Sequence, residues 1–170
     1  MGGLFLMLAD ASGALTLPGV PTAVPEREST AIHEFRADPA SVPEARRVTC
    51  EFACESMSEE QLGKLGLAVT ELMANAVRHS GSSEPITLIL NHKEPHFCVR
   101  VVDGGAGLVP APGAMASEPG AGFGLFLVEQ LTKRWGVTRE DARTRVWFEI
   151  DYTASGSDGA AASDAPCDPL

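Results

Sequence analysis

The spacing of hydrophobic residues changes along the middle of the chain, and each spacing is typical of a helix or of a strand. Two segments with a helical period of about 3.6 residues predict helices from about Val42 to Met57 and from about Glu59 to His79. The second begins after Ser58-Glu-Glu-Gln61, a capping box that satisfies backbone N–H groups at a helix start. Its wide apolar face is expected to pack against a sheet. That face consists of Leu62, Leu65, Val69, Leu72, Met73, Ala76 and Val77.

Other segments have the alternation of strands or the pattern of a third helix. The β-rich segments are residues 32–36, 86–90, 97–102 and 145–151. The second and third are separated only by Asn91-His-Lys-Glu-Pro95, so they are expected to form a hairpin. An amphipathic helix is predicted from Leu125 to Arg134, with basic residues in its last turn. No internal repeat is present.

Composition supports one folded domain between two tails. The chain has 170 residues, of which 44% are hydrophobic, and this fits one domain with its own core. We expect the folded domain over residues 30–152, a flexible tail over 1–29 and a disordered tail over 153–170. The apolar N-terminus has no basic segment before it and is too short for a membrane span. It is either a flexible tail or a short partner-docking element.

Charge and cysteine usage narrow the class of protein further. The net charge of −10 argues against binding to nucleic acid or to anionic membranes, because such binding depends on clustered Lys and Arg. The four cysteines, Cys50, Cys54, Cys98 and Cys167, lack the spacing of a zinc site. They are expected to be buried free thiols, which suits the cytoplasm.

Three polar residues form a stripe along the second predicted helix. Glu71, Asn75 and Arg78 are separated by four and three positions, so they lie along one side of the helix beside its apolar face. A carboxylate, a carboxamide and a guanidinium suit a site for Mg²⁺ and nucleotide phosphates. The same triplet, seen alone, also fits a solvated helix edge.

Two glycine-rich turns follow this helix. The first, Asp103-Gly-Gly-Ala-Gly107, ends a predicted strand, and its glycines allow a ligand to approach the backbone. A carboxylate there can accept hydrogen bonds from an exocyclic amine such as that of adenine. The second, Gly122-Phe-Gly124, opens the third helix, where free N–H groups can bind an anion. A plain tight turn is the other interpretation. Residues 108–121 between them are expected to be a mobile loop over a site.

These motifs resemble those of a known superfamily. Glu71-Leu-Met-Ala-Asn-Ala-Val-Arg-His79 is similar to its N box, Asp103-x-Gly-x-Gly107 to its G1 box and Gly122-x-Gly-Leu-x-Leu127 to its G2 box. The superfamily contains gyrase, Hsp-type chaperones, histidine kinases and MutL. The chain most resembles the stand-alone anti-sigma factor serine kinases and their actinomycete paralogues. The resemblance implies an α+β, Bergerat-type fold: a two-layer sandwich with a mixed, mostly antiparallel sheet against helices.

The resemblance also implies ligands, roles and partners. It implies ATP and Mg²⁺ as cofactors, with Asn75 as the metal ligand, Glu71 as the general base and Asp103 as the residue that binds adenine. Further nucleotide-binding positions that it implies are Arg78, His79, Gly105, Gly107, Gly122, Phe123, Gly124, Leu125 and Thr144. The implied partners are a sigma factor or an anti-sigma antagonist, and a homodimer through the first strand is implied as well.

Two functions remain open at this point. One is a serine kinase that phosphorylates an antagonist and sequesters a sigma factor. The other is a nucleotide-dependent binding module without efficient transfer, because residues 108–121 contain no Lys or Arg, whereas characterised kinases of the family have a basic residue there. A histidine-kinase fragment or a gyrase-type ATPase is disfavoured, since we expect neither a phosphoacceptor helix nor a transducer domain.

Overall fold

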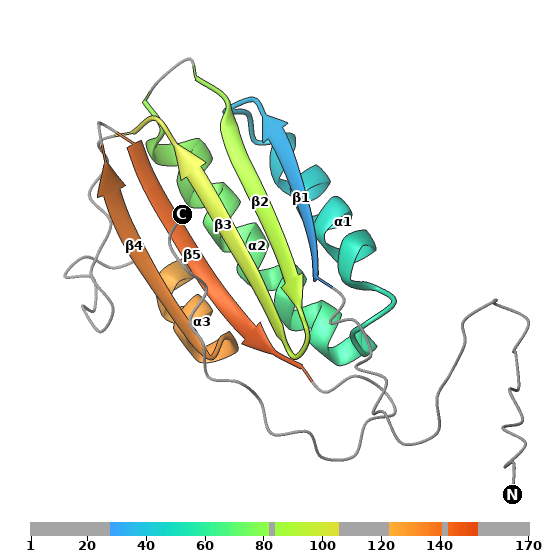
Figure 1. Ribbon diagram of the computed structural model, residues 1–170. Coiled ribbons are helices and arrows are strands. Elements are labelled where there is room, and N and C mark those ends of the chain that lie inside the picture. The colour runs from blue at the N-terminus through green and yellow to red at the C-terminus, as the bar shows by residue number, and fades with distance from the viewer. Residues whose placement is uncertain (1–27, 82–83, 106–122, 141–142, 153–170) are drawn as a thin grey trace, which may run out of the picture.

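The structure, a computed structural model, consists of one five-stranded sheet with three helices on one of its faces (Figure 1). It describes residues 28–81, 84–105, 123–140 and 143–152. The elements are β1 (Glu28–Phe35), α1 (Ser41–Ala53), α2 (Glu59–His79), β2 (Ile86–Lys93), β3 (His96–Asp103), α3 (Phe123–Leu131), β4 (Arg134–Glu140) and β5 (Arg143–Asp151).

The strands lie in the order β1-β2-β3-β5-β4, and each described pairing is antiparallel. The predicted two-layer α+β fold is therefore confirmed, with an antiparallel sheet where a mixed one was expected. Because β3 and β5 pair antiparallel, the end of β3 lies beside the start of β5. This end of the sheet also receives the C-terminal end of α2 (Figure 1).

The core lies between the sheet and the helices, with α2 at its centre. Five of the seven residues in the predicted apolar face of α2 are buried, and Leu62 and Val77 are partly buried against the core. The sheet contributes large, fully buried side chains, and each such side chain contributes roughly 1.5–3 kcal/mol. They include Leu88, Leu90, Phe97, Val99 and Phe148. None of the described helices is both long and apolar enough to cross a membrane.

The start and end of α2 are those predicted from the sequence. The Ser58 hydroxyl accepts a hydrogen bond from the Gln61 backbone N–H at 3.3 Å, and the Gln61 side chain accepts one from the Ser58 backbone N–H at 2.8 Å. This capping box fixes the first turn. The helix then runs unbroken to His79, which carries its polar stripe to the end of the sheet where β3 stops.

The structure corrects the prediction for residues after Leu131. The helix ends there, so Lys133 and Arg134 are not in its last turn, and a strand that the sequence analysis missed begins at Arg134. The reason is pairing with β5, since the Lys133 N–H already donates to the Glu149 carbonyl at 2.9 Å. Trp135 and Val137 then pack against the core.

The structure also differs from the predictions at the ends of two other elements and in the burial of the cysteines. The first helix, α1, ends at Ala53 and not at Met57, while β1 begins at Glu28, inside the segment expected to be a tail. Three cysteines are free thiols as expected, but only Cys98 is buried, and Cys54 is exposed, contrary to the prediction. Cys167 lies outside the described residues.

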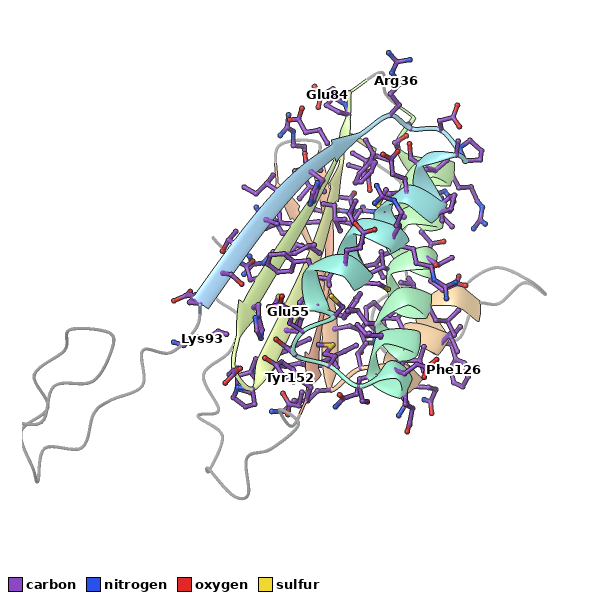
Figure 2. All side chains as sticks on the ribbon, turned by 90° about the vertical axis from the view of Figure 1, so that its right-hand side faces the viewer. Arg36, Glu55, Glu84, Lys93, Phe126 and Tyr152 are labelled. Atoms are coloured by element: carbon purple, nitrogen blue, oxygen red, sulfur yellow. The ribbon has the colours of Figure 1, made fainter. Side chains whose placement is uncertain are left out.

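The other end of the sheet contains a buried histidine whose charge depends on pH. His92 is hydrogen-bonded to the Tyr152 hydroxyl, which lies at the end of the molecule away from Glu84 (Figure 2). Burial lowers the pKa of the His92 imidazole below its ordinary 6.5, although Glu94 opposes this effect. The unfolded chain therefore takes up a proton at this residue before the folded chain does.

We expect the free energy of unfolding to fall as the pH drops below 6.5 because of His92. Urea unfolding of the wild type and His92→Gln between about pH 5 and 8 measures this contribution. The decline below 6.5 is expected to be shallower in the variant. Equal pH dependence of the two proteins would show that His92 contributes nothing to it.

Candidate functional site

The predicted site residues gather at the end of the sheet where β3 stops. Asp103, the last residue of β3, pairs with Thr144 at the start of β5. Gly105 follows two residues later and lies against the backbone of His79, the last residue of α2. Three segments that are far apart in the sequence therefore meet at this end. Glu84, which precedes β2, marks the same end in Figure 2.

Asp103 is a buried carboxylate held by its own turn. Its side chain is only 6% exposed, and its Oδ1 accepts a hydrogen bond from the Gly105 N–H at 2.8 Å. Burial raises the pKa of the Asp103 carboxyl above its ordinary value, while the Gly105 hydrogen bond and the charges of His79 and Arg139 oppose that rise. An ionised carboxylate with acceptor capacity to spare is suited to bind an amine of a ligand.

Thr144 holds the same turn from the opposite side. Its hydroxyl donates to the Gly105 carbonyl at 2.7 Å, and the residue is 2% exposed. A Cβ at Gly105 would lie 2.1 Å from the His79 carbonyl oxygen, so only glycine fits between β3 and the end of α2. Thr144 and Gly105 together fix the position of Asp103.

Thr144→Val is expected to weaken both the fold and the binding of a nucleotide. The substitution leaves the buried Gly105 carbonyl without its partner, at a cost of about 1–3 kcal/mol. Thr144→Ser keeps the hydroxyl and serves as the matched control. Urea unfolding and calorimetric titration with MgATP measure the two effects. A valine variant that matches the serine variant in both measurements would show that this hydrogen bond is unimportant.

The polar stripe on α2 leads along the helix to His79, which lies against Gly105. Glu71 and Asn75 are half-buried, whereas Arg78 and His79 are exposed. The Arg78 guanidinium donates to the Asn75 side-chain oxygen at 3.2 Å, so the two residues are held together along the helix. That amide oxygen is of the type that a hard cation accepts as a ligand.

The start of α3 lies against Glu71. A Cβ at Gly124 would lie 2.4 Å from a carboxylate oxygen of Glu71, so the absence of a side chain lets the two helices approach closely. Phe123 is the first residue of α3. The predicted nucleotide-binding residue Leu125 is 6% exposed, and its side chain belongs to the hydrophobic core. The predicted residues Gly107 and Gly122, and the loop 108–121, lie outside the described residues.

A second polar cluster lies at the opposite end of the sheet. His96, Glu149 and Asp151 form the one group of possible metal ligands among the described residues, with ligand atoms within 4.8 Å of one another. Two cations already neutralise it: Lys133 lies 2.7 Å from Asp151, and Arg134 lies 2.9 Å from the buried Glu149.

The pKa of Asp151 agrees with this arrangement. Burial raises the pKa of the Asp151 carboxyl, but hydrogen bonds and charges from Lys133 and His96 outweigh burial and hold it below its ordinary value. We interpret the cluster as ion pairs that stabilise the sheet, and Asn75 stays the candidate metal ligand.

Comparison with known proteins agrees with this geometry. Residues 35–150 match the family model of the histidine kinase-like ATPase domain. The chain belongs to this family. Such a domain implies ATP binding, and the glycine at 105, the amide oxygen of Asn75 and the exposed cations of α2 fit a nucleotide with its metal ion.

Two solved structures match the chain at low sequence identity, and the first of them shares its fold. The RsbU and RsbW domains of Rv1364c from Mycobacterium tuberculosis match with a TM-score of 0.58 and 15% identity, over 72% of this chain. The histidine kinase AdeS from Acinetobacter baumannii matches with a TM-score of 0.46 and 12% identity, over 71% of this chain and 67% of its own. This chain covers only 32% of the Rv1364c structure. No curated protein matches.

The sequence analysis missed one residue of this region, Arg139. It lies on β4, opposite Thr144, and its charge acts on Asp103. The strand was missed because Gly136 interrupts an otherwise regular alternation. The sequence does contain a sign of this strand, because apolar and polar residues alternate there. Trp135 and Val137 lie on one side, and Arg134 and Thr138 lie on the other.

Proposed function

We propose that this protein is an ATP-dependent serine kinase of the anti-sigma type. In this proposal it phosphorylates a serine of an anti-sigma antagonist and sequesters a sigma factor, in the cytoplasm and as a homodimer. The observation that carries the proposal is the contact of Glu71 with Gly124, because it places a carboxylate at the start of α3, beside Asn75. The likeness to a structure containing an RsbW domain supports the class of kinase.

The nucleotide would be held by residues of β3, α2 and α3. Asp103 would accept a hydrogen bond from the adenine amine, and Asn75 would bind Mg²⁺ through its side-chain oxygen. Backbone N–H groups at Phe123 and Gly124 would face the phosphates at the start of α3. When bound, MgATP supplies the phosphoryl group that is transferred.

Arg78 provides a guanidinium and His79 an imidazole at the exposed end of α2. In the proposed site they would offset negative charge on the phosphates. Arg78 also holds the Asn75 side-chain oxygen in place, at 3.2 Å.

Glu71 would act as the general base. It would accept the proton of the substrate serine, so that the serine oxygen could take the phosphoryl group that MgATP would supply, with ADP as the leaving group. The carboxylate is half-buried and lies one helical turn before Asn75, so the base and the metal ligand project from the same side of α2. The products are phosphoserine and ADP.

A second function is favoured by one observation. Residues 108–121 contain no Lys or Arg, although phosphoryl transfer depends on positive charge near the transferred group. The alternative is therefore a binding module that uses the same nucleotide site to capture a regulatory partner without efficient transfer.

Phosphoserine formation distinguishes the two functions. The protein is incubated with MgATP and a small single-domain antagonist that carries a phosphorylatable serine, and the antagonist is analysed by mass spectrometry. The kinase proposal predicts a phosphoserine that requires both proteins and Mg²⁺. Binding of ATP without any transfer would support the binding module in its place.

A further inference from the structure

Arg139 lies in one row with Asp103 and Thr144 across three strands. Thr144 of β5 is opposite Asp103 of β3 on one side and opposite Arg139 of β4 on the other. Residues directly opposite one another in antiparallel strands project to the same face of the sheet. Trp135 and Val137, at alternate positions of the same strand, pack against the core, so Arg139 also projects to the face that carries the helices.

The guanidinium of Arg139 has no hydrogen bond or ion pair with another described residue that would hold it away from the site. The residue is exposed, and no hydrogen bond or ion pair of its side chain is found within the described ranges 28–81, 84–105, 123–140 and 143–152. The neighbouring Arg143 differs in both respects. It projects to the opposite face of the sheet and pairs with Glu84 at 3.1 Å.

Among the residues that the structure describes, few groups act on the Asp103 carboxylate. The turn contributes the Gly105 N–H, α2 contributes His79 and β4 contributes Arg139. The Thr144 hydroxyl from β5 donates to the Gly105 carbonyl and not to the carboxylate. A guanidinium stays charged throughout the physiological pH range. Arg139 therefore contributes a permanent positive charge that acts on Asp103.

We propose that Arg139 is a positioning residue of the nucleotide site, which holds the Asp103 carboxylate ionised and ready to accept a hydrogen bond from an adenine amine. This inference rests on the proposed binding of adenine by Asp103. It implies that Arg139 extends nucleotide binding to mildly acidic pH, where a buried carboxylate without a cation nearby takes up a proton.

Calorimetric titration with MgADP over a pH series tests this role. Wild-type affinity is expected to fall at the acidic end of the series as Asp103 takes up a proton. In Arg139→Gln this fall should begin at higher pH, with affinity roughly threefold below wild type at about pH 5.5 and nearly equal at about pH 8. Arg139→Lys retains the charge and should restore the wild-type profile.

Arg143→Gln is the matched control, since it removes the same charge from the other face of the sheet and should leave the profile unchanged. Titration of the nucleotide itself is common to all variants and cancels in the comparison. An Arg139→Gln profile that coincides with wild type overturns the inference. A loss of affinity equal at every pH also overturns it, because it would show a direct ligand contact. Failure of the wild type to bind MgADP would instead refute the proposed function.

Discussion

Replacing Gly105 with alanine is expected to weaken nucleotide binding strongly. The added methyl group would lie 2.1 Å from the His79 carbonyl oxygen and 2.8 Å from the Asp103 carboxylate. The carbonyl belongs to the backbone of α2, so the turn itself must move, and Asp103 moves with it. Strain of roughly 1–3 kcal/mol corresponds to a loss of about 5- to 150-fold in affinity for MgATP, measured by calorimetry.

Gly63→Ala is the matched control for this substitution. A Cβ at Gly63 meets nothing within 4 Å, and alanine stabilises a helix by about 1 kcal/mol relative to glycine. The affinity of the Gly63→Ala variant for MgATP is expected to equal that of the wild type. If Gly105→Ala also binds MgATP as the wild type does, the turn after β3 does not hold the nucleotide.

Glu71→Gln is expected to lose phosphoryl transfer while it retains nucleotide binding. Loss of a general base lowers the rate by about 10²- to 10⁴-fold, and the isosteric amide keeps the contact with Gly124. The measurement is the rate of phosphoserine formation under single-turnover conditions, together with the affinity for MgATP.

Glu129→Gln removes the same charge from an exposed position of α3 and should leave the rate unchanged. A Glu71→Gln variant that transfers phosphate at the wild-type rate would refute the role as base. Loss of MgATP affinity in the same variant would assign Glu71 to the structure of the binding site.

The parts of the fold that the sequence predicted are those with strong local signals. The helix α2 has a capping box, an apolar face and an unbroken periodic pattern, so its limits follow from local rules. The strand β4 has no such signal. Gly136 interrupts its alternation, and its formation depends on pairing with β5, which is a tertiary interaction.

The same distinction applies to the candidate site. The residues of the motifs could be found because each motif is local in sequence. The hydrogen bond of Thr144 to the Gly105 carbonyl joins residues 39 positions apart and could not be derived from spacing. The position of Arg139 depends on the register of the missed strand β4, and the burial of Leu125 depends on how α3 packs against α2.

The central claim is that the end of the sheet around Asp103 binds a nucleotide, and NMR titration tests it most directly. Amide resonances of the ¹⁵N-labelled protein are followed as MgATP is added. We expect the largest changes at Asn75, Gly105, Gly124 and Thr144, with little change at Tyr152, which lies at the opposite end. The largest changes at that opposite end, or none at saturating nucleotide, would contradict the claim.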